Sequence, residues 1–520
     1  MASSKPGIGK NSGKNSYRTT DKDDIATMNS AGINTDKNLS SSPRDTEDNN
    51  LNDKTELMLC RKIDFYVVPN VAILYLFCFI DRANVGNAKL AGFEKDLQMT
   101  GYDFNKMLTA FYISYVIFEI PGNLTCKWMG PGWFIPLSSL GFGVCSLSMA
   151  FVQNLVSASV VRFLIGAFES AMLPGIAYYL SRWYRRRELA FRLSLYIVMA
   201  PIAGAFGGLL ASGILKISSV GSIHGWRLIF AVEGLITCLV AIVSLFTMTD
   251  RPETASWLTQ EEKNLCYLRT KSDLVSEAEF LDKINKKKLM RGIFNPITIP
   301  TAFIFFLINI TVQGFSFFTP TVVSTIYPSS SVISQQLRTV PPYLVGAFFT
   351  VLIPLLSTKF DNRIIFFILS APLMIIGYIV FVASSINDYK IRYIATFFAA
   401  SGSFCFAALC NALVSANVIS DTARSGAMAT TGMFGSLGGL VATWSFLPTD
   451  APNYYIGNSL NLATSVTILL ISIVLLWWMK FDNRKRNCKN LTYELSQLAV
   501  LSNKEIEELE WKHPLFRWSL

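Results

Sequence analysis

Long apolar stretches alternate with short polar ones along most of this 520-residue chain. A helix needs about 20 mainly apolar residues to cross a hydrocarbon core about 30 Å thick. Twelve stretches meet this requirement, near residues 65–91, 106–123, 133–152, 155–180, 190–213, 226–248, 297–319, 340–358, 363–385, 391–415, 425–447 and 459–479. The pattern predicts an all-α membrane protein with twelve transmembrane helices.

Polar segments divide the chain into five regions. Residues 249–296 are the one long polar segment between apolar stretches, and they separate residues 62–248 from residues 297–480. Each block holds six predicted spans, so we expect two six-helix halves around a central cavity. Residues 1–61 have no apolar run and are rich in Ser, Asn, Asp, Lys and Thr, which is typical of a disordered tail. Residues 481–520 form a second polar tail.

Lysine and arginine are unevenly distributed over the polar segments. The segment 249–296, the C-terminal tail and the loop at 182–187 are rich in them, whereas the loops on the other side carry isolated residues such as Lys95 and Lys216. Basic residues concentrate on the cytosolic side of membrane proteins. We therefore expect both termini and the middle linker in the cytosol.

The composition agrees with a membrane protein and excludes several other classes. Charged residues make up 16% of the chain, against about 25% in soluble proteins. The net charge of +10 is scattered between apolar runs, so we expect no nucleic-acid partner. The nine cysteines have no metal-ligand spacing, and there is no catalytic triad or nucleotide motif. We therefore expect free thiols and neither enzyme activity, metal nor cofactor.

The first predicted span contains a pair of charges, Asp81 and Arg82. Small and apolar residues continue the span beyond this pair, which places it within the membrane. Tyr75, Arg82 and Gly86 then share one helical face. A guanidinium beside aromatic surface is a suitable receptor for a carboxylate, because it offers two parallel donors. The alternative is a structural ion pair at the mouth of the helix.

The fourth predicted span contains Arg162 and Glu169, seven residues apart and thus two helical turns apart on one face. Intramembrane charges are rare and mark substrate or proton pathways. Glu169 has no cation close in sequence, which is the situation of a proton carrier, although a permanent ion pair with another span is the alternative. We interpret Arg162 as structural.

Further polar residues complete the predicted site. Glu233 lies in the sixth span, where a proton relay and a buried partner for an arginine both remain open, and Glu119 lies near the cytosolic end of the second span. The second half carries amides and aromatics in place of central charges, which suits a ligand with an anionic end and a flat or apolar end. The residues that we predict to contact substrate are Tyr75, Arg82, Asn84, Gln313, Phe317 and Asn411.

Taken together, several short motifs resemble the anion:cation symporter family of the major facilitator superfamily, in its fungal allantoate-permease-like branch. They are Asp81-Arg82 with Asn84, Gly86 and Asn87; Pro121-Gly122-Asn123; Arg162 with Gly166, Glu169 and Pro174; Trp183-Tyr184 with Arg187-Glu188; Gly225-Trp226-Arg227 with Glu233-Gly234; and Phe317–Thr321. The segment Lys512–Trp518 looks like the tail of nicotinate-permease-like members. Lys127 stands where the superfamily's loop between spans 2 and 3 usually has Asp, so that loop's gating salt bridge is not assigned to Lys127.

The resemblance implies the major facilitator fold and proton-driven uptake of a small organic carboxylate such as nicotinate or allantoate. By motif position, Arg82 would hold the substrate carboxylate, while Asp81 and Glu169 would carry protons. From the residues themselves we assign Arg162 and Glu233 as structural charges, with a proton relay as the alternative for Glu233, and Glu119 as a gate or packing charge. We expect a monomer in the plasma membrane, with an endomembrane as the alternative. A nutrient receptor that binds ligand without transporting it is the alternative function.

Overall fold

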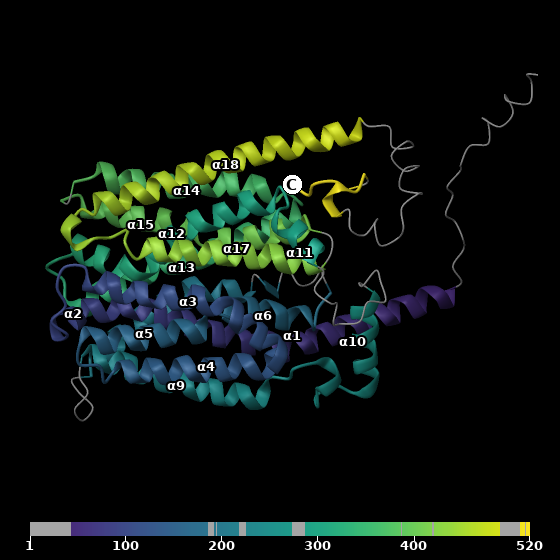
Figure 1. Ribbon diagram of the computed structural model, residues 1–520, viewed down its shortest axis with the longest axis horizontal. Helices are drawn as coiled ribbons and strands as arrows, with labels where there is room; N and C mark the ends of the chain where they lie inside the picture. The colour runs from purple at the N-terminus through teal and green to yellow at the C-terminus, as the bar shows by residue number, and fades with distance from the viewer. Residues whose placement is uncertain are drawn as a thin grey trace, which may run out of the picture. The chain divides into compact units, whose positions relative to one another are not determined.

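The computed structural model describes residues 43–185, 192–193, 195–217, 225–272, 286–385, 387–418, 421–488, 510–514 and 516–520. Throughout these residues the regular elements are helices, and the described residues contain no strand (Figure 1). The chain divides into two compact units, residues 1–58 and residues 59–520. The helix bundle described below belongs to the second unit, which holds all the predicted site residues.

Helices occupy the apolar stretches of the first block. Its long helices are α1 (Pro43–Leu90), α3 (Asp103–Met129), α4 (Pro131–Met149), α5 (Leu155–Glu169), α6 (Met172–Ser181), α8 (Met199–Ile214) and α9 (Trp226–Thr247), with the short α2 (Phe93–Asp96) between α1 and α3. The helix α1 begins at Pro43, well before residue 62, where the sequence predicted the tail to end. The residues ahead of the span include Glu, Leu and Lys, which are good helix formers and allow the helix to extend.

The linker between the blocks contains the helices η1 (Pro252–Thr254), α10 (Gln260–Ser272) and α11 (Lys286–Ile293). The second block contains α12 (Thr298–Ile326), α13 (Val332–Lys359), α14 (Arg363–Ala383), α15 (Tyr389–Ser403), α16 (Phe406–Ala416), α17 (Asp421–Ala442) and α18 (Tyr455–Asn487), with η2 (Pro448–Asp450) before α18 and η3 (Glu510–Lys512) near the C-terminus. Residues 1–42 of the predicted N-terminal tail, 273–285 of the linker and 489–509 of the C-terminal tail lie outside the described residues.

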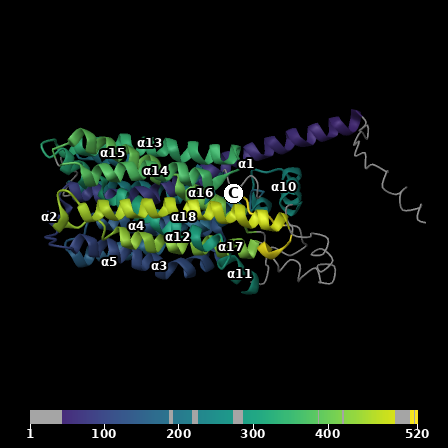
Figure 2. The same cartoon turned by 90° about the horizontal axis from the view of Figure 1, so that it is seen from above.

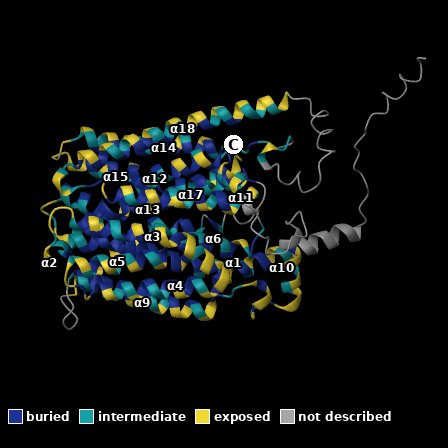
Figure 3. Cartoon of the chain, viewed as in Figure 1, coloured by how far each residue is buried: buried dark blue, intermediate teal, exposed yellow. Residues whose placement is uncertain are grey.

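Ten helical stretches among the described residues are long and apolar enough to cross a membrane. The predicted second and eleventh spans correspond to α3 and α17, which are of similar length but more polar. The helix α3, for example, carries Asp103, Lys106, Glu119 and Lys127. Large apolar side chains such as Phe246 and Trp128 are exposed on the outside of the bundle, while the sides that face other helices are buried (Figure 3). This distribution is that of a bundle in contact with lipid.

The fourth span is divided into α5 and α6 at Ser170–Ala171, and the tenth into α15 and α16 at Phe404–Cys405. Pro174 explains the first break, because proline lacks the N–H that would bond to the carbonyl of Ser170 and its ring crowds that carbonyl. Both halves therefore contain a discontinuous helix, a feature that transporter folds use to build sites near the middle of the membrane.

The helices of residues 59–520 run side by side, as the two views of the bundle show (Figures 1 and 2). Within the first half α4 packs on α9 and α3 packs on α5, and within the second half α12 packs on α17 and α14 packs on α15 and α18. The two halves meet where α8 contacts α13 and where α3 contacts α17. We call the end of the bundle where α1 ends at Leu90 the Leu90 end, and the opposite end the linker end.

The C-terminal segment binds to the linker end of the second half. The side-chain amide of Asn417, which follows α16, exchanges two hydrogen bonds with the main chain of Ser519, at 2.9 and 3.0 Å. Asn483 on α18 does the same with the main chain of Trp518, at 2.9 and 3.0 Å. The main-chain N–H of Arg363, at the start of α14, donates to the carbonyl of Leu520 at 2.6 Å. The segment thus joins α14, α16 and α18.

Candidate functional site

A cavity lies between the two halves, with ≈ 850 Å³ of space that includes solvent open to it. Polar atoms reach it from both halves, while most of its wall is apolar or aromatic, as is usual for small-molecule sites. The side chains of the first half that line it include Tyr75, Phe79, Arg82, Tyr112, Tyr115 and Met172, and those of the second half include Phe305, Asn309, Gln313, Phe404, Asn411 and Ser436.

Arg82 is the guanidinium that lines this cavity. It lies on α1, and its side chain is 7% exposed. Its Nε atom donates a hydrogen bond of 2.8 Å to Oε2 of Glu169, which is fully buried at the last residue of α5. The rings of Phe79, Phe111 and Tyr115 lie 4.9, 5.3 and 5.2 Å from the guanidinium carbon. Arg82 is thus held by one carboxylate and three aromatic rings while still reaching the cavity.

Asp81, the neighbour of Arg82 in sequence, makes a second ion pair with α5. Its Oδ2 atom accepts a 2.8 Å hydrogen bond from Nη1 of Arg162 on α5, and its Oδ1 atom accepts one of 2.7 Å from Ser146 on α4. Asp81 is 1% exposed and Arg162 is 2% exposed. The two adjacent charges of α1 therefore pair with residues two turns apart on α5.

A third buried carboxylate, Glu233 on α9, lies beside these ion pairs. Its Oε2 atom accepts a 2.6 Å hydrogen bond from the amide of Asn84, and that amide's oxygen accepts one of 3.1 Å from Asn87. The main-chain oxygen of Asn87 accepts a 3.3 Å hydrogen bond from Gln336 on α13. Polar contacts therefore run from Glu233 through α1 to the second half.

Glu119 lies near the linker end of the cavity. Its Oε2 atom accepts a 3.2 Å hydrogen bond from the hydroxyl of Ser436 on α17, which lines the cavity wall. Glu119 is 7% exposed. This contact joins α3 of the first half to α17 of the second.

The cavity brings together four of the six residues that the sequence predicted to contact substrate: Tyr75, Arg82, Gln313 and Asn411. The other two, Asn84 and Phe317, do not line it. Asn84 points to Glu233 instead, because it lies two residues after Arg82 and thus on another face of α1. The ring of Phe317 packs against Tyr112, with 6.2 Å between the ring centroids.

Several lining residues, among them Tyr112 and Tyr115, were not predicted from the sequence, whereas Asn309 is one of the second-half amides expected to face the ligand. Tyr112 and Tyr115 lie three residues apart on α3, so their spacing showed only that they share a face. Nothing in the sequence indicated whether that face meets lipid, another helix or a cavity. Asn309 is an amide within an apolar run, and its position one turn before Gln313 was the available signal.

Close helix contacts bring the two halves together toward the Leu90 end. A Cβ atom on Gly86 of α1 would overlap the carbonyl oxygen of Phe317 on α12, and one on Gly204 of α8 would overlap the ring of Tyr343 on α13. Asn105 on α3 donates a 2.6 Å hydrogen bond to the carbonyl of Thr443, which follows α17. Small residues at such contacts allow two backbones to approach each other closely.

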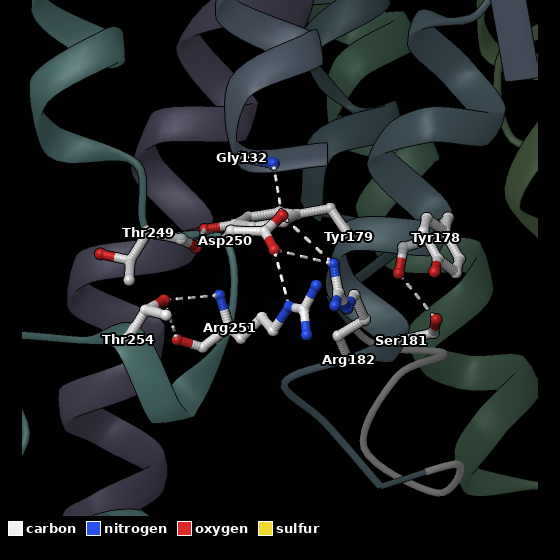
Figure 4. Close-up of polar contacts among 9 residues, drawn as sticks. All are labelled: Gly132, Tyr178, Tyr179, Ser181, Arg182, Thr249, Asp250, Arg251 and Thr254. Carbon is white, nitrogen blue, oxygen red and sulfur yellow. Dashed lines mark hydrogen bonds and ion pairs between the residues drawn. The ribbon is translucent and has the colours of Figure 1, made fainter. Parts of the chain in front are cut away.

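A second polar cluster lies at the linker end of the first half, where Asp250 follows α9 (Figure 4). Its carboxylate accepts hydrogen bonds from the main-chain N–H of Gly132 at 3.1 Å, from Arg182 at 3.2 Å and from Arg251 at 3.0 Å. Gly132 is in the first turn of α4, whose unpaired N–H groups favour an anion. Asp250 therefore connects the ends of α4, α6 and α9.

The family profile of the Major Facilitator Superfamily matches residues 71–443, which is more than half of the chain. The chain belongs to the Major Facilitator Superfamily. A solved structure of the Escherichia coli xylose transporter XylE, in a partially occluded inward-open conformation, superposes with a TM-score of 0.61 at 16% identity and covers 78% of this chain and 97% of that one. The fold is thus the one that the sequence predicted for this superfamily.

Two fungal transporters are similar to this superfamily member over most of their length. An uncharacterized transporter of Schizosaccharomyces pombe is 34% identical, with 90% of this chain and 91% of that protein covered. The high-affinity nicotinic acid transporter of Saccharomyces cerevisiae is 30% identical, with 87% of this chain and 84% of that protein covered. The chain is therefore a multi-pass membrane transporter.

Proposed function

We propose that this transporter is a proton-coupled symporter for a small organic carboxylate. The observation that carries the proposal is the position of Arg82, a guanidinium that lines the central cavity and is held by a buried carboxylate, Glu169. A substrate carboxylate that binds this guanidinium competes with Glu169 for its positive charge, because Arg82 already donates its Nε–H to Glu169. Protonation of Glu169 removes the competing negative charge, so proton uptake and anion binding favour each other.

The rest of the cavity wall supports a substrate with a flat or apolar body. Tyr75 of the first half and Phe305 and Phe404 of the second contribute aromatic surface. The second half, opposite Arg82, also contributes the amides of Asn309, Gln313 and Asn411. The similarity to a nicotinic acid transporter agrees with this chemistry. Nicotinate, a planar aromatic ring with one carboxylate, is therefore the first substrate to test.

The transport cycle that we infer is alternating access by movement of one half against the other. The cavity accepts proton and anion when the Leu90 end is open, which we expect to be the extracellular side. The anion then balances the charge of Arg82 and the proton neutralises Glu169. With both charges balanced, the halves can close at Gly86 and Gly204. The anion and proton leave together at the linker end, and we expect this to occur across the plasma membrane.

Uptake measurements test the proposal directly. Cells that lack their own carboxylate permeases would express the chain and receive labelled nicotinate and a panel of other carboxylates, at acidic and neutral external pH, with and without a protonophore. We expect uptake that rises in acid and is lost with the protonophore. Uptake that depends neither on external pH nor on the protonophore would contradict proton coupling. Binding without uptake of any acid would favour a transporter-like receptor.

A further inference from the structure

The buried charges around α1 do not balance. Three carboxylates, Asp81, Glu169 and Glu233, face two guanidiniums, Arg82 and Arg162. All five residues are buried, and none is more than 6% exposed. Since a buried charge without a counter-charge is strongly unfavourable, a neutral cluster requires one proton on one of the three carboxylates.

The hydrogen bonds indicate which carboxylate lacks a counter-charge. Arg82 is paired with Glu169 and Arg162 is paired with Asp81, each at 2.8 Å. Glu233 has only the neutral amide of Asn84 as a hydrogen-bond donor, and its Oε1 atom is buried without a partner. It is the carboxylate of this cluster that has no guanidinium in contact.

Arg162 has unused hydrogen-bond donors that can pair with Glu233. The Nε and Nη2 atoms of Arg162 are buried and have no hydrogen-bond partner, so this guanidinium uses one of its donor atoms on Asp81 and leaves two unused. The charged groups that act on Glu233 are Asp81 from α1 and Arg162 and Glu169 from α5. The α4 helix contributes the hydroxyl of Ser146, which donates to Asp81. Arg162 can thus serve either carboxylate, and the one that loses it takes the proton.

We propose that Glu233 is a third proton-linked carboxylate of this transporter, and that it shares one proton with Asp81 through Arg162. This inference rests on the proposed function, because it concerns the protons that accompany the anion. When an anion binds Arg82, the cluster holds four negative groups against two positive ones, so the neutral state requires two protons. One is on Glu169, and the other is shared by Glu233 and Asp81.

The contacts of Asn84 extend this role to the opening of the Leu90 end. Asn84 links Glu233 to Asn87, and the main chain of Asn87 is bonded to Gln336 of the second half. Gly207 on α8 also lies against Asn84, where a Cβ would be 3.1 Å from the amide oxygen. A change in the charge of Glu233 therefore acts on Asn84, whose neighbour Asn87 bonds to the second half through its main chain.

The test is the number of protons taken up with each anion. Purified full-length protein in detergent would bind nicotinate between pH 6 and 9, a range in which nicotinate stays an anion, and the slope of log Kd against pH gives the protons taken up. For the unmodified protein we expect a slope of about one on the acid side, where the shared proton is already bound, rising toward two on the alkaline side. For Glu233→Gln, whose cluster is neutral without that proton, we expect a slope that does not exceed one.

The other possible slopes distinguish failure of the Glu233 role from failure of the proposed function. A slope that never exceeds one in the unmodified protein, or that still approaches two in Glu233→Gln, overturns the role of Glu233 while leaving the proposed function intact. A slope of zero in both proteins, or no binding of any carboxylate, contradicts the proposed function itself. Glu233→Asp keeps a titratable group and is expected to restore the rise toward two, which a purely structural role of Glu233 does not require.

Discussion

The guanidinium of Arg82 on α1 donates a 2.8 Å hydrogen bond to Glu169, where α5 ends beside the break in the fourth span. This pair places a cation at the cavity wall and a carboxylate directly behind it. Binding of an anion to Arg82 and binding of a proton to Glu169 therefore weaken the same contact, and each favours the other. The first two predictions concern the two members of this pair.

Arg82→Lys is expected to weaken substrate binding without unfolding the protein. Lysine keeps the positive charge but loses the planar pair of donors and the stacking on Phe79 and Tyr115. Loss of one charge-assisted hydrogen bond corresponds to about 1.5–3 kcal/mol, or roughly a 10- to 100-fold rise in the KM for uptake. Arg392→Lys is the matched control, because Arg392 is a buried arginine on α15 that bonds to Asn453 away from the cavity. An unchanged KM in Arg82→Lys would contradict the binding role.

Glu169→Gln is expected to separate exchange from accumulation. The glutamine side chain can still accept a hydrogen bond from Arg82 but cannot bind or release a proton. Labelled substrate should then exchange across the membrane in counterflow, whereas accumulation against a gradient should be lost at every external pH. Glu262→Gln serves as the control, because Glu262 is a linker residue away from the cavity that makes a partly exposed ion pair with Lys62 and a hydrogen bond with the main chain of Thr259. Full accumulation by Glu169→Gln would remove Glu169 from proton coupling.

Gly86→Ala is expected to prevent the halves from closing at the Leu90 end. The added methyl group would overlap the carbonyl oxygen of Phe317, and a main-chain atom cannot move aside as a flexible side chain can. We expect a fall in the maximal uptake rate of at least about tenfold, with normal amounts of protein in the membrane. Gly213→Ala is the control for adding a methyl group to a helix glycine, since a Cβ there has no atom within 4 Å. Equal uptake by the two variants would argue against closure at Gly86.

Asp250→Asn is expected to destabilise the linker end of the first half. The substitution removes the ion pair with Arg182, whose side chain is 13% exposed, and leaves that cation without its counter-charge. We expect a loss of about 1–3 kcal/mol of stability, measurable as a lower midpoint of thermal unfolding in detergent. Arg251→Gln changes the other ion pair of Asp250, but Arg251 is 57% exposed, so its effect should stay below about 1 kcal/mol. Equal midpoints for both variants would contradict this ranking.

Cysteine labelling checks the orientation expected from the basic residues. Cys488, after α18, is exposed, whereas Cys60, Cys126 and Cys266 are buried. A membrane-impermeant maleimide should label Cys488 only after the cells are permeabilised, and Cys488→Ser should remove that signal. Burial raises the pKa of Cys266 to about 11, so below this pH its thiol stays protonated and contributes little reactive thiolate. Labelling of Cys488 in intact cells would reverse the orientation.

The sequence predicted the positions of most helices closely. The sixth span was expected at 226–248 and α9 is found at Trp226–Thr247, while the ninth was expected at 363–385 and α14 is found at Arg363–Ala383. Apolar runs of this length have few alternatives, because backbone polar groups in lipid must be satisfied within a helix. The break between α5 and α6 was not predicted, although Pro174 carried the signal for it.

The site was harder to derive than the fold. The charged residues stood out individually because each interrupts an apolar run. Their pairing depends on how each helix is rotated about its axis and on which helices are neighbours, and neither property is local in sequence. Arg162 was expected to have a structural role, but nothing in the chain indicated that its partner is Asp81. For the same reason Asn84 was assigned to the cavity, whereas it contacts Glu233.

Asp81 and Arg82 are neighbours on α1, yet they pair with Arg162 and Glu169, which are two turns apart on α5. Loss of the positive charge of either arginine leaves a buried carboxylate without its counter-charge, and such losses are severe. A viable loss of an arginine at these positions therefore needs two mutations at once, for example neutralisation of both Asp81 and Arg162. The intermediate with one mutation would be selected against. We therefore expect related proteins to keep all four residues together, while the surrounding apolar positions vary.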